Sequence, residues 1–208
     1  MDIFFRYIFI FLFSLLSALR WFFKLKYRVY KGGVFTKDEG PFLTAARSLL
    51  GIPLIAGVIF YVFFPQLHPW MYLPLPFWVR ILSAVTASLS LILLFRTHKT
   101  LKAGFSTNLR IPDSAALTTE GPYKFIRHPM YTAYFILMLS AFGITRNYII
   151  GFFGLSIILL LMSFRRAKEE AQLIGKFGED YKKYLRNTPA FFPKLFRSYS
   201  KSQSQVLK

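Results

Sequence analysis

The apolar positions of the chain fall into five runs separated by polar segments. A helix needs about 20 apolar residues to cross the ~30 Å hydrocarbon core of a bilayer, and the runs approach or reach that length. The pattern therefore predicts an all-α integral membrane bundle of about five transmembrane helices. The runs are Ile3 to Phe23, Leu43 to Phe64, Phe77 to Phe95, Met130 to Ile144 and Tyr148 to Phe164.

The first and last runs need interpretation. The first begins after Asp2 and is not followed by a suitably placed small-residue cleavage site, so we interpret it as an uncleaved span and not as a signal peptide. The last two are separated only by Thr145 to Asn147, which predicts an antiparallel helical hairpin.

Beyond the fifth run, apolar residues recur at helical spacing among charged ones. This pattern predicts an amphipathic helix on the cytoplasmic face, broken or bent near Gly175 and Gly178. Its apolar positions are Leu173, Phe177, Tyr181, Tyr184 and Leu185. We expect residues 1–193 to form a single integral membrane domain, followed by a basic, disordered tail at 194–208.

Charge and composition refine this picture. With 54% hydrophobic residues and a formal charge of +18, the chain suits a membrane better than nucleic acid, because its bases lie in loops beside the runs. Lys and Arg concentrate in residues 24–47, 96–128 and from Arg165 onward, which predicts an outside N-terminus, cytoplasmic long loops and a cytoplasmic C-terminus. Cysteine is absent, which excludes disulfides, thiolate metal sites and a cysteine nucleophile.

The polar stretch GPYKFIRHPMY, residues 121–131, leads into the fourth run. Pro129 suits the first turn of a helix that begins near Arg127 or His128, and such a start offers amide donors to an anion. Arg127 adds a fixed two-pronged donor. The alternative is that Arg127 and His128 merely bind lipid phosphate at headgroup level.

Glu169 and Glu170 lie about one turn into the C-terminal helix. Arg165 and Arg166 are their i,i+4 partners, so each glutamate is suited to a surface ion pair. Adjacent helical side chains point about 100° apart, from which we expect only one glutamate to face a pocket. Because the last two runs form a hairpin, we expect the glutamates to come close to Arg127 and His128.

These motifs together carry a resemblance. LTTEGPYKFIRHPMYTAY, followed about forty residues later by EEAQLIGKFGEDYKKYLRNTPAFFP, resembles the isoprenylcysteine carboxyl methyltransferase and phospholipid methyltransferase superfamily of integral membrane enzymes. The resemblance covers roughly residues 80–193, which it implies to be the cofactor-binding core. The chain departs from the eukaryotic carboxyl methyltransferases in lacking a clear His- and Asn-rich helix before this region.

The resemblance implies methyl transfer from S-adenosyl-L-methionine, bound on the cytoplasmic side, to a carboxylate or amine of a lipid or lipid-linked molecule. It implies Arg127, Glu170 and His128 as catalytic residues, with Arg127 at the reacting centre and no metal. The implied cofactor-binding residues are Leu117, Thr118, Gly121, Pro122, Tyr123, His128, Pro129, Tyr131, Glu169 and Glu170.

Elementary chemistry leaves the acceptor open. A carboxylate attacks a methyl sulfonium without a base, whereas an amine or phenol must lose a proton and would need Glu170 or His128 as base. Two rival classes also remain. One is a nicotinamide-dependent lipid or sterol reductase of related architecture, and the other is a non-catalytic phospholipid-binding membrane protein. Oligomeric state and organism are not readable from the sequence.

Overall fold

The computed structural model describes residues 2–27, 40–66, 69–101 and 116–193, and this part of the chain is helical. Two short 3-10 helices, η2 (Pro69–Met71) and η4 (Gly121–Lys124), lie in the connections. The main helices are α1 (Asp2–Lys26), α2 (Pro41–Phe63), α3 (Phe77–Leu101), α4 (Pro129–Thr145), α5 (Tyr148–Leu160) and α6 (Arg166–Asn187). The segment 194–208, predicted to be a disordered tail, lies outside the described residues.

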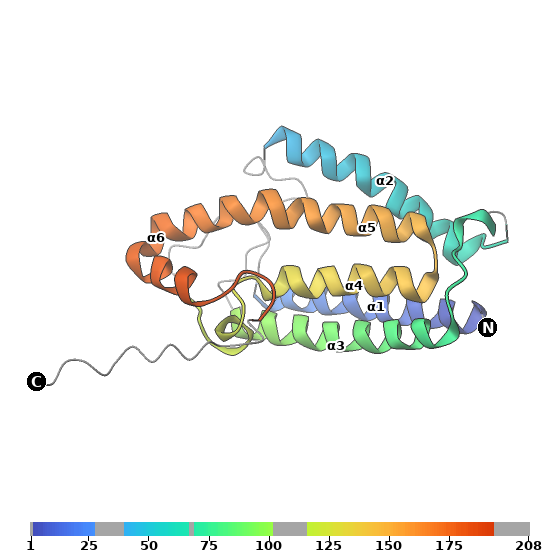
Figure 1. The fold of residues 1–208 in the computed structure, drawn as a ribbon, viewed down its shortest axis with the longest axis horizontal. Helices are drawn as coiled ribbons and strands as arrows, with labels where there is room; N and C mark the ends of the chain where they lie inside the picture. The colour runs from blue at the N-terminus through green and yellow to red at the C-terminus, as the bar shows by residue number, and fades with distance from the viewer. Residues whose placement is uncertain (1, 28–39, 67–68, 102–115, 194–208) are drawn as a thin grey trace, which may run out of the picture.

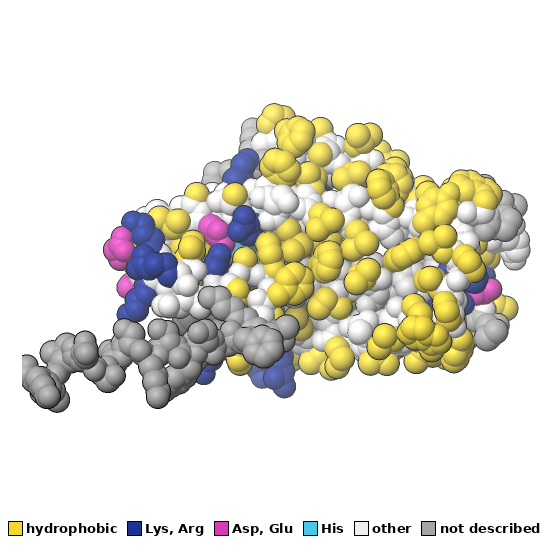
Figure 2. Space-filling model, in the orientation of Figure 1, with side chains coloured by type: hydrophobic (Ala, Val, Ile, Leu, Met, Phe, Trp, Pro, Cys, Tyr) yellow, Lys and Arg dark blue, Asp and Glu magenta, His cyan; other side chains and the backbone are white. Residues whose placement is uncertain are grey.

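The helices form the integral membrane bundle that the sequence predicts. In Figure 1, α1, α3, α4 and α5 run along the long axis, and α2 crosses α5 obliquely. Within the described part of the chain, four helices are long and apolar enough to cross a membrane, and α4, with 17 residues, is a shorter apolar helix. The hydrophobic side chains in Figure 2 cover the length of the bundle, whereas Lys, Arg, Asp and Glu gather towards its ends.

The fifth apolar run and the amphipathic helix are one continuous helix, a continuity that the sequence pattern did not reveal. A π-helical turn, Leu161–Arg165, joins α5 to α6, so the helix has 40 residues from Tyr148 to Asn187. Up to the kink at Gly178, roughly the first 30 residues of this helix rise about 45 Å at 1.5 Å per residue, which exceeds the ~30 Å hydrocarbon thickness, so the charged α6 extends beyond the membrane-spanning part. The predicted bend is at Gly178, where φ is 55° and ψ is −126°.

The hairpin between α4 and α5 is confirmed, and its turn has a clear local cause. Arg146 ends α4 in the left-handed conformation, with φ of 60°. Asn147 then caps α5, because its side-chain oxygen accepts hydrogen bonds from the amides of Ile149 and Ile150 at 3.0 and 3.1 Å. The turn folds α5 back along α4 and brings α6 to the end of the bundle where α4 begins.

Two glycines allow close helix packing. A Cβ added at Gly143 would lie 1.9 Å from Oγ of Ser83, so α3 and α4 approach more closely than any other side chain at this position would permit. A Cβ at Gly57 would lie 2.9 Å from Cγ2 of Ile149, which brings α2 against α5. The first contact fixes the position of α4, on which the polar cluster described next depends.

Candidate functional site

The chain enters α4 through a tight turn. Gly121 adopts φ of 55°, and a Cβ there would lie 2.7 Å from Oγ1 of Thr100, so this position suits glycine for both backbone and space. Pro122 occupies the start of η4, and α4 begins with Pro129, directly after His128 at its N-cap. Proline in the first helical turn has no amide to leave unpaired. The helix therefore begins where the sequence predicted.

The segment that follows α6 returns to this helix start and is tied to it. The amides of Arg127 and His128 donate to the carbonyl oxygens of Pro189 and Ala190, each at 2.9 Å. The hydroxyl of Thr132 donates to the Phe191 carbonyl at 2.7 Å. Figure 1 shows this red segment running back from α6 to the yellow start of α4. Backbone hydrogen bonds thus connect the start of α4 to the segment that follows α6.

Arg127 connects the start of α4 to α6 and to the residue that follows it. Its Nη1 donates to the carbonyl oxygens of Leu185 and Thr188, and its Nε and Nη2 donate to Oε1 of Glu170 at 3.3 and 3.0 Å. Its side chain is 9% exposed. All three guanidinium nitrogens therefore have acceptors within the protein, and the arginine fixes Glu170 against the end of α6.

His128 lies between the two glutamates. Its Nε2 is 2.9 Å from Oε1 of Glu170, and its Nδ1 is 3.9 Å from Oε2 of Glu169. The hydroxyl of Tyr131, one turn along α4, donates to Oε1 of Glu169 at 2.8 Å. Residues predicted to converge from two distant parts of the sequence do so here.

The expectation that only one glutamate would face this region is wrong. Both carboxylates reach residues at the start of α4 while keeping their i,i+4 pairs: Arg165 Nε lies 3.0 Å from Glu169, and Arg166 Nη1 lies 3.7 Å from Glu170. The 100° between neighbouring positions is bridged because two flexible side chains approach His128 from either side. The i,i+4 pairs themselves are as predicted.

Burial and hydrogen bonding shift the pKa values of a glutamate and two tyrosines in the site. Burial opposes ionisation of Glu170, but hydrogen bonds from His128 and Arg127 outweigh it and lower the pKa of that carboxyl to about 2. Burial raises the pKa of Tyr123 and of Tyr184, so both phenols are neutral at physiological pH. The Tyr184 hydroxyl donates to the Tyr123 carbonyl at 2.6 Å, which ties η4 to α6. The cluster therefore presents the ionised carboxylate of Glu170 beside neutral tyrosines.

The remaining residues of the expected site are less central. Leu117 and Thr118 are half-buried and precede η4, outside the hydrogen-bonded cluster formed by the described residues. Sequence reasoning gave Arg166 only a surface ion pair and gave Phe191 no role. In the structure the Arg166 guanidinium lies 5.7 Å from the Phe191 ring centroid, and its buried Nε has no hydrogen-bond partner among the described residues. The described residues contain no group of three or more metal-ligating side chains.

Comparison with known proteins identifies relatives of the second half of the chain. The model of the isoprenylcysteine carboxyl methyltransferase (ICMT) family matches residues 80–175. A protein-S-isoprenylcysteine O-methyltransferase of Schizosaccharomyces pombe is 31% identical over 77 residues, 37% of this chain and 33% of that protein. The nickel-cobalt-cadmium resistance protein NccN of Alcaligenes xylosoxydans xylosoxydans is 34% identical over 89 residues, 42% of this chain and 41% of that protein.

A solved structure shares the fold. The eukaryotic intramembrane Ras methyltransferase ICMT superimposes on 89% of this chain and 67% of its own chain, with a TM-score of 0.54 and 21% sequence identity. The chain spans between about a third and two fifths of the length of the curated relatives named here. The segment matched by the family contains Arg127, His128, Tyr131 and both glutamates.

Proposed function

Because residues 80–175 match the model of the isoprenylcysteine carboxyl methyltransferase family, we propose that this integral membrane protein is a methyltransferase that uses S-adenosyl-L-methionine. The acceptor is an amphiphile whose tail stays in the bilayer. The observation that carries the proposal is the convergence of Glu169 and Glu170 on His128, within the segment that the family matches. The distribution of Lys and Arg supports a cytoplasmic site.

The donor set of the cluster fits the cofactor. S-adenosyl-L-methionine carries an ammonium, a carboxylate and ribose hydroxyls, together with a sulfonium that supplies an electrophilic methyl group. Glu169 and Glu170 provide carboxylates for its cationic groups, and Glu169 is the more accessible, with 26% of its side chain exposed against 13%. The unpartnered Nε of Arg166 fits the cofactor carboxylate. We expect Gly121, Pro122 and Tyr123 to line the adjoining side of the bound cofactor.

The low pKa of Glu170 favours a carboxylate acceptor. A general base works best when its pKa is near the working pH, and a carboxyl with a pKa of about 2 is a weak base at neutral pH. The two ring nitrogens of His128 already face glutamate oxygens. An acceptor carboxylate needs no base: its oxygen forms the bond to the methyl group, and the electron pair of the broken bond stays on sulfur.

The residues of this chain then act by positioning and by excluding water. Glu170 and His128 position the bound cofactor. Arg127 contacts Glu170 and the segment after α6. It therefore acts on the reacting centre indirectly, by fixing the position and the ionised state of Glu170. Tyr131 orients Glu169 through its hydroxyl. We propose residues 1–193 as the functional unit, with 80–193 holding the cofactor.

Calorimetric titration of the detergent-purified protein with S-adenosylhomocysteine tests the cofactor. Saturable binding is expected in the wild type and should be lost in the Glu169→Gln, Glu170→Gln double variant. Glu179→Gln is the matched control, because Glu179 lies on the same helix with its side chain 75% exposed and pairs with Lys182. The proposal would be contradicted if the protein bound a nicotinamide cofactor or an anionic lipid but did not bind S-adenosylhomocysteine.

Methyl transfer from labelled S-adenosyl-L-methionine tests the acceptor. An S-farnesyl cysteine with a free carboxylate is chosen because relatives are named for isoprenylcysteine. Its carboxamide is the matched control, and phosphatidylethanolamine represents an amine acceptor. We expect label in the carboxylate compound as a base-labile ester. Transfer to the amine alone would overturn the preference for a carboxylate while leaving the methyltransferase proposal intact.

A further inference from the structure

The segment that follows α6, residues 189–193, runs along the first turns of α4. Its first two residues bond to the residues just before this helix. Further along, the Phe191 carbonyl accepts a hydrogen bond from the hydroxyl of Thr132 at 2.7 Å. The Phe192 ring centroid then lies 6.3 Å from the ring centroid of Phe135. Successive residues of the segment therefore contact successively later positions of α4.

The position of Phe192 across the membrane follows from α4. This apolar helix begins at Pro129, and its 17 residues rise about 25 Å at 1.5 Å per residue, close to the ~30 Å of a hydrocarbon core. Because α4 packs against α3 and α5, parts of two candidate spans, its start lies near the hydrocarbon boundary. Phe135 lies about 9 Å beyond that start along the helix. A ring beside Phe135 therefore lies within the apolar layer.

The face of α4 that carries Phe135 is turned towards lipid. Leu139 lies one turn further along this face and is 49% exposed, although it belongs to the inner part of the helix. Phe192 is itself 58% exposed. Hydrophobic side chains cover the surface of the bundle along its length in Figure 2. The exposed ring of Phe192 thus continues the surface that α4 offers to acyl chains.

The backbone of the segment is suited to an apolar environment. The carbonyl oxygens of Pro189, Ala190 and Phe191 all accept hydrogen bonds from residues at the start of α4. Pro189 and Pro193 carry no amide hydrogen, and the segment contains no charged side chain. Non-helical backbone is tolerated at membrane depth only where its polar groups are bonded within the protein. The first three carbonyls of the segment meet that requirement.

Phe191, the neighbour of Phe192, contacts the polar cluster instead. Its ring centroid lies 5.9 Å from that of His128, and the Arg166 guanidinium lies 5.7 Å from it. Two adjacent rings thus contact different surroundings, one the candidate site and the other the lipid-facing side of α4. Because the two residues share a peptide bond, whatever holds Phe192 at the bilayer also holds Phe191 beside His128.

We propose that residues 189–193 insert shallowly into the leaflet on the α6 side of the membrane, where Phe192 contacts acyl chains and thereby fixes Phe191 beside His128. The bilayer is then the partner that keeps this segment against the start of α4. The insertion does not depend on methyl transfer, whereas its effect on cofactor binding rests on the proposed function.

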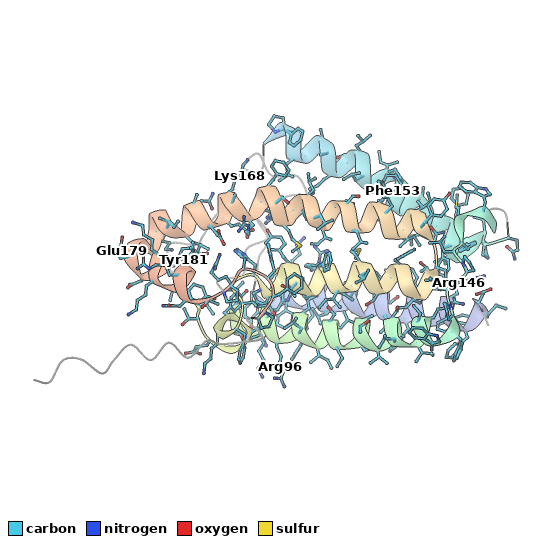
Figure 3. The ribbon with its side chains drawn as sticks, in the orientation of Figure 1. Arg96, Arg146, Phe153, Lys168, Glu179 and Tyr181 are labelled. Carbon is cyan, nitrogen blue, oxygen red and sulfur yellow. The ribbon has the colours of Figure 1, made fainter. Side chains whose placement is uncertain are left out.

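Spin labelling in phosphatidylcholine bilayers tests the insertion. The chain has no cysteine, so a single introduced cysteine carries a unique nitroxide. Labelled Phe192→Cys is compared with Leu139→Cys, on the lipid-facing side of α4, and with Glu179→Cys, at the bend of α6 labelled in Figure 3. Collisions with oxygen, which concentrates in hydrocarbon, and with a water-soluble nickel chelate report the depth of each label. We expect oxygen collisions to dominate in the first two proteins and nickel collisions in the third. Dominant nickel collisions in Phe192→Cys, or protection from both reagents, would overturn the proposal.

Cofactor affinity in the same bilayers tests the effect on the site. Phe192→Gln should raise the Kd for S-adenosylhomocysteine about threefold to tenfold, whereas Phe192→Leu, which keeps an apolar side chain, should retain the wild-type value. Phe22→Gln is the matched control, because it removes a phenyl ring of α1 that is 52% exposed. An unchanged Kd in Phe192→Gln, or an equal rise in Phe22→Gln, would overturn the coupling. Absence of nucleoside binding in the wild type would refute the proposed function, and the label depths would still decide the insertion.

Discussion

The contacts of Glu170 with His128 and Arg127 give a quantitative prediction. The pKa of Glu170 falls from its ordinary value of 4.5 to about 2. At about 1.4 kcal/mol per pKa unit this corresponds to about 3 kcal/mol, which we reduce to about 2 kcal/mol for partial solvent screening. Glu170→Gln keeps the shape of the side chain and removes the charge, so we expect it to lower the free energy of unfolding by about 2 kcal/mol.

A double-mutant cycle separates this pair from general damage. Arg127→Gln should cost more than Glu170→Gln, because it also releases the carbonyl oxygens of Leu185 and Thr188. Once Arg127 is gone, Glu170→Gln should cost at least about 1 kcal/mol less than in the wild type. The assay is unfolding by sodium dodecyl sulfate in mixed micelles, followed by circular dichroism. Additive costs would refute the pairing as the source of the stabilisation.

The same contacts of Glu170 predict a pH dependence. Because the folded pKa of Glu170 is lowered, its stabilisation is fully present above the unfolded value of 4.5 and is lost as the pH falls through about 2. The stability difference between the wild type and Glu170→Gln should therefore be constant near neutral pH and shrink below about pH 4.5. A difference that grows on acidification would contradict this reasoning.

Two further substitutions test neighbouring features. Tyr131→Phe removes the donor to Glu169 and should weaken S-adenosylhomocysteine binding about threefold to tenfold, measured by calorimetry, with an unchanged helical spectrum; an unchanged Kd would remove the tyrosine from the site. Gly143→Ala forces a Cβ against Ser83 and should lower stability by about 1–3 kcal/mol, measured by the same unfolding assay. Gly51→Ala, which meets nothing within 4 Å, is its control, and equal effects would contradict the close packing.

The sequence predicted the bundle because span length and hydropathy are local properties. All five apolar runs are helices, and the hairpin turn at Asn147 is where three polar residues interrupt the pattern. The meeting of His128 with the two glutamates could also be predicted, because a hairpin necessarily brings the start of one helix to the end of the other. The motif at residues 121–131 and the glutamate pair were therefore sufficient to propose a site.

Other features have no local sequence signal. The amides of Arg127 and His128 bind carbonyl oxygens of Pro189 and Ala190, and every residue except proline carries such an amide, so side-chain patterns do not identify these partners. The pairing of Asp2 with Arg80 joins residues 78 positions apart. The convergence of both glutamates depended on side-chain reach, which the angle between neighbouring positions does not fix.

The π-helical turn at Leu161–Arg165 sets the direction in which the glutamate pair points. Such a turn accommodates about one residue more than an α-helix of the same rise, and each residue of an α-helix rotates the chain by about 100°. Regular α-helical geometry through these same residues would keep the span apolar and continuous, yet would rotate α6 by about 100° and carry Glu169 and Glu170 away from His128. The direction of both glutamates is thus determined by the geometry of a turn that supplies none of the proposed cofactor-binding residues.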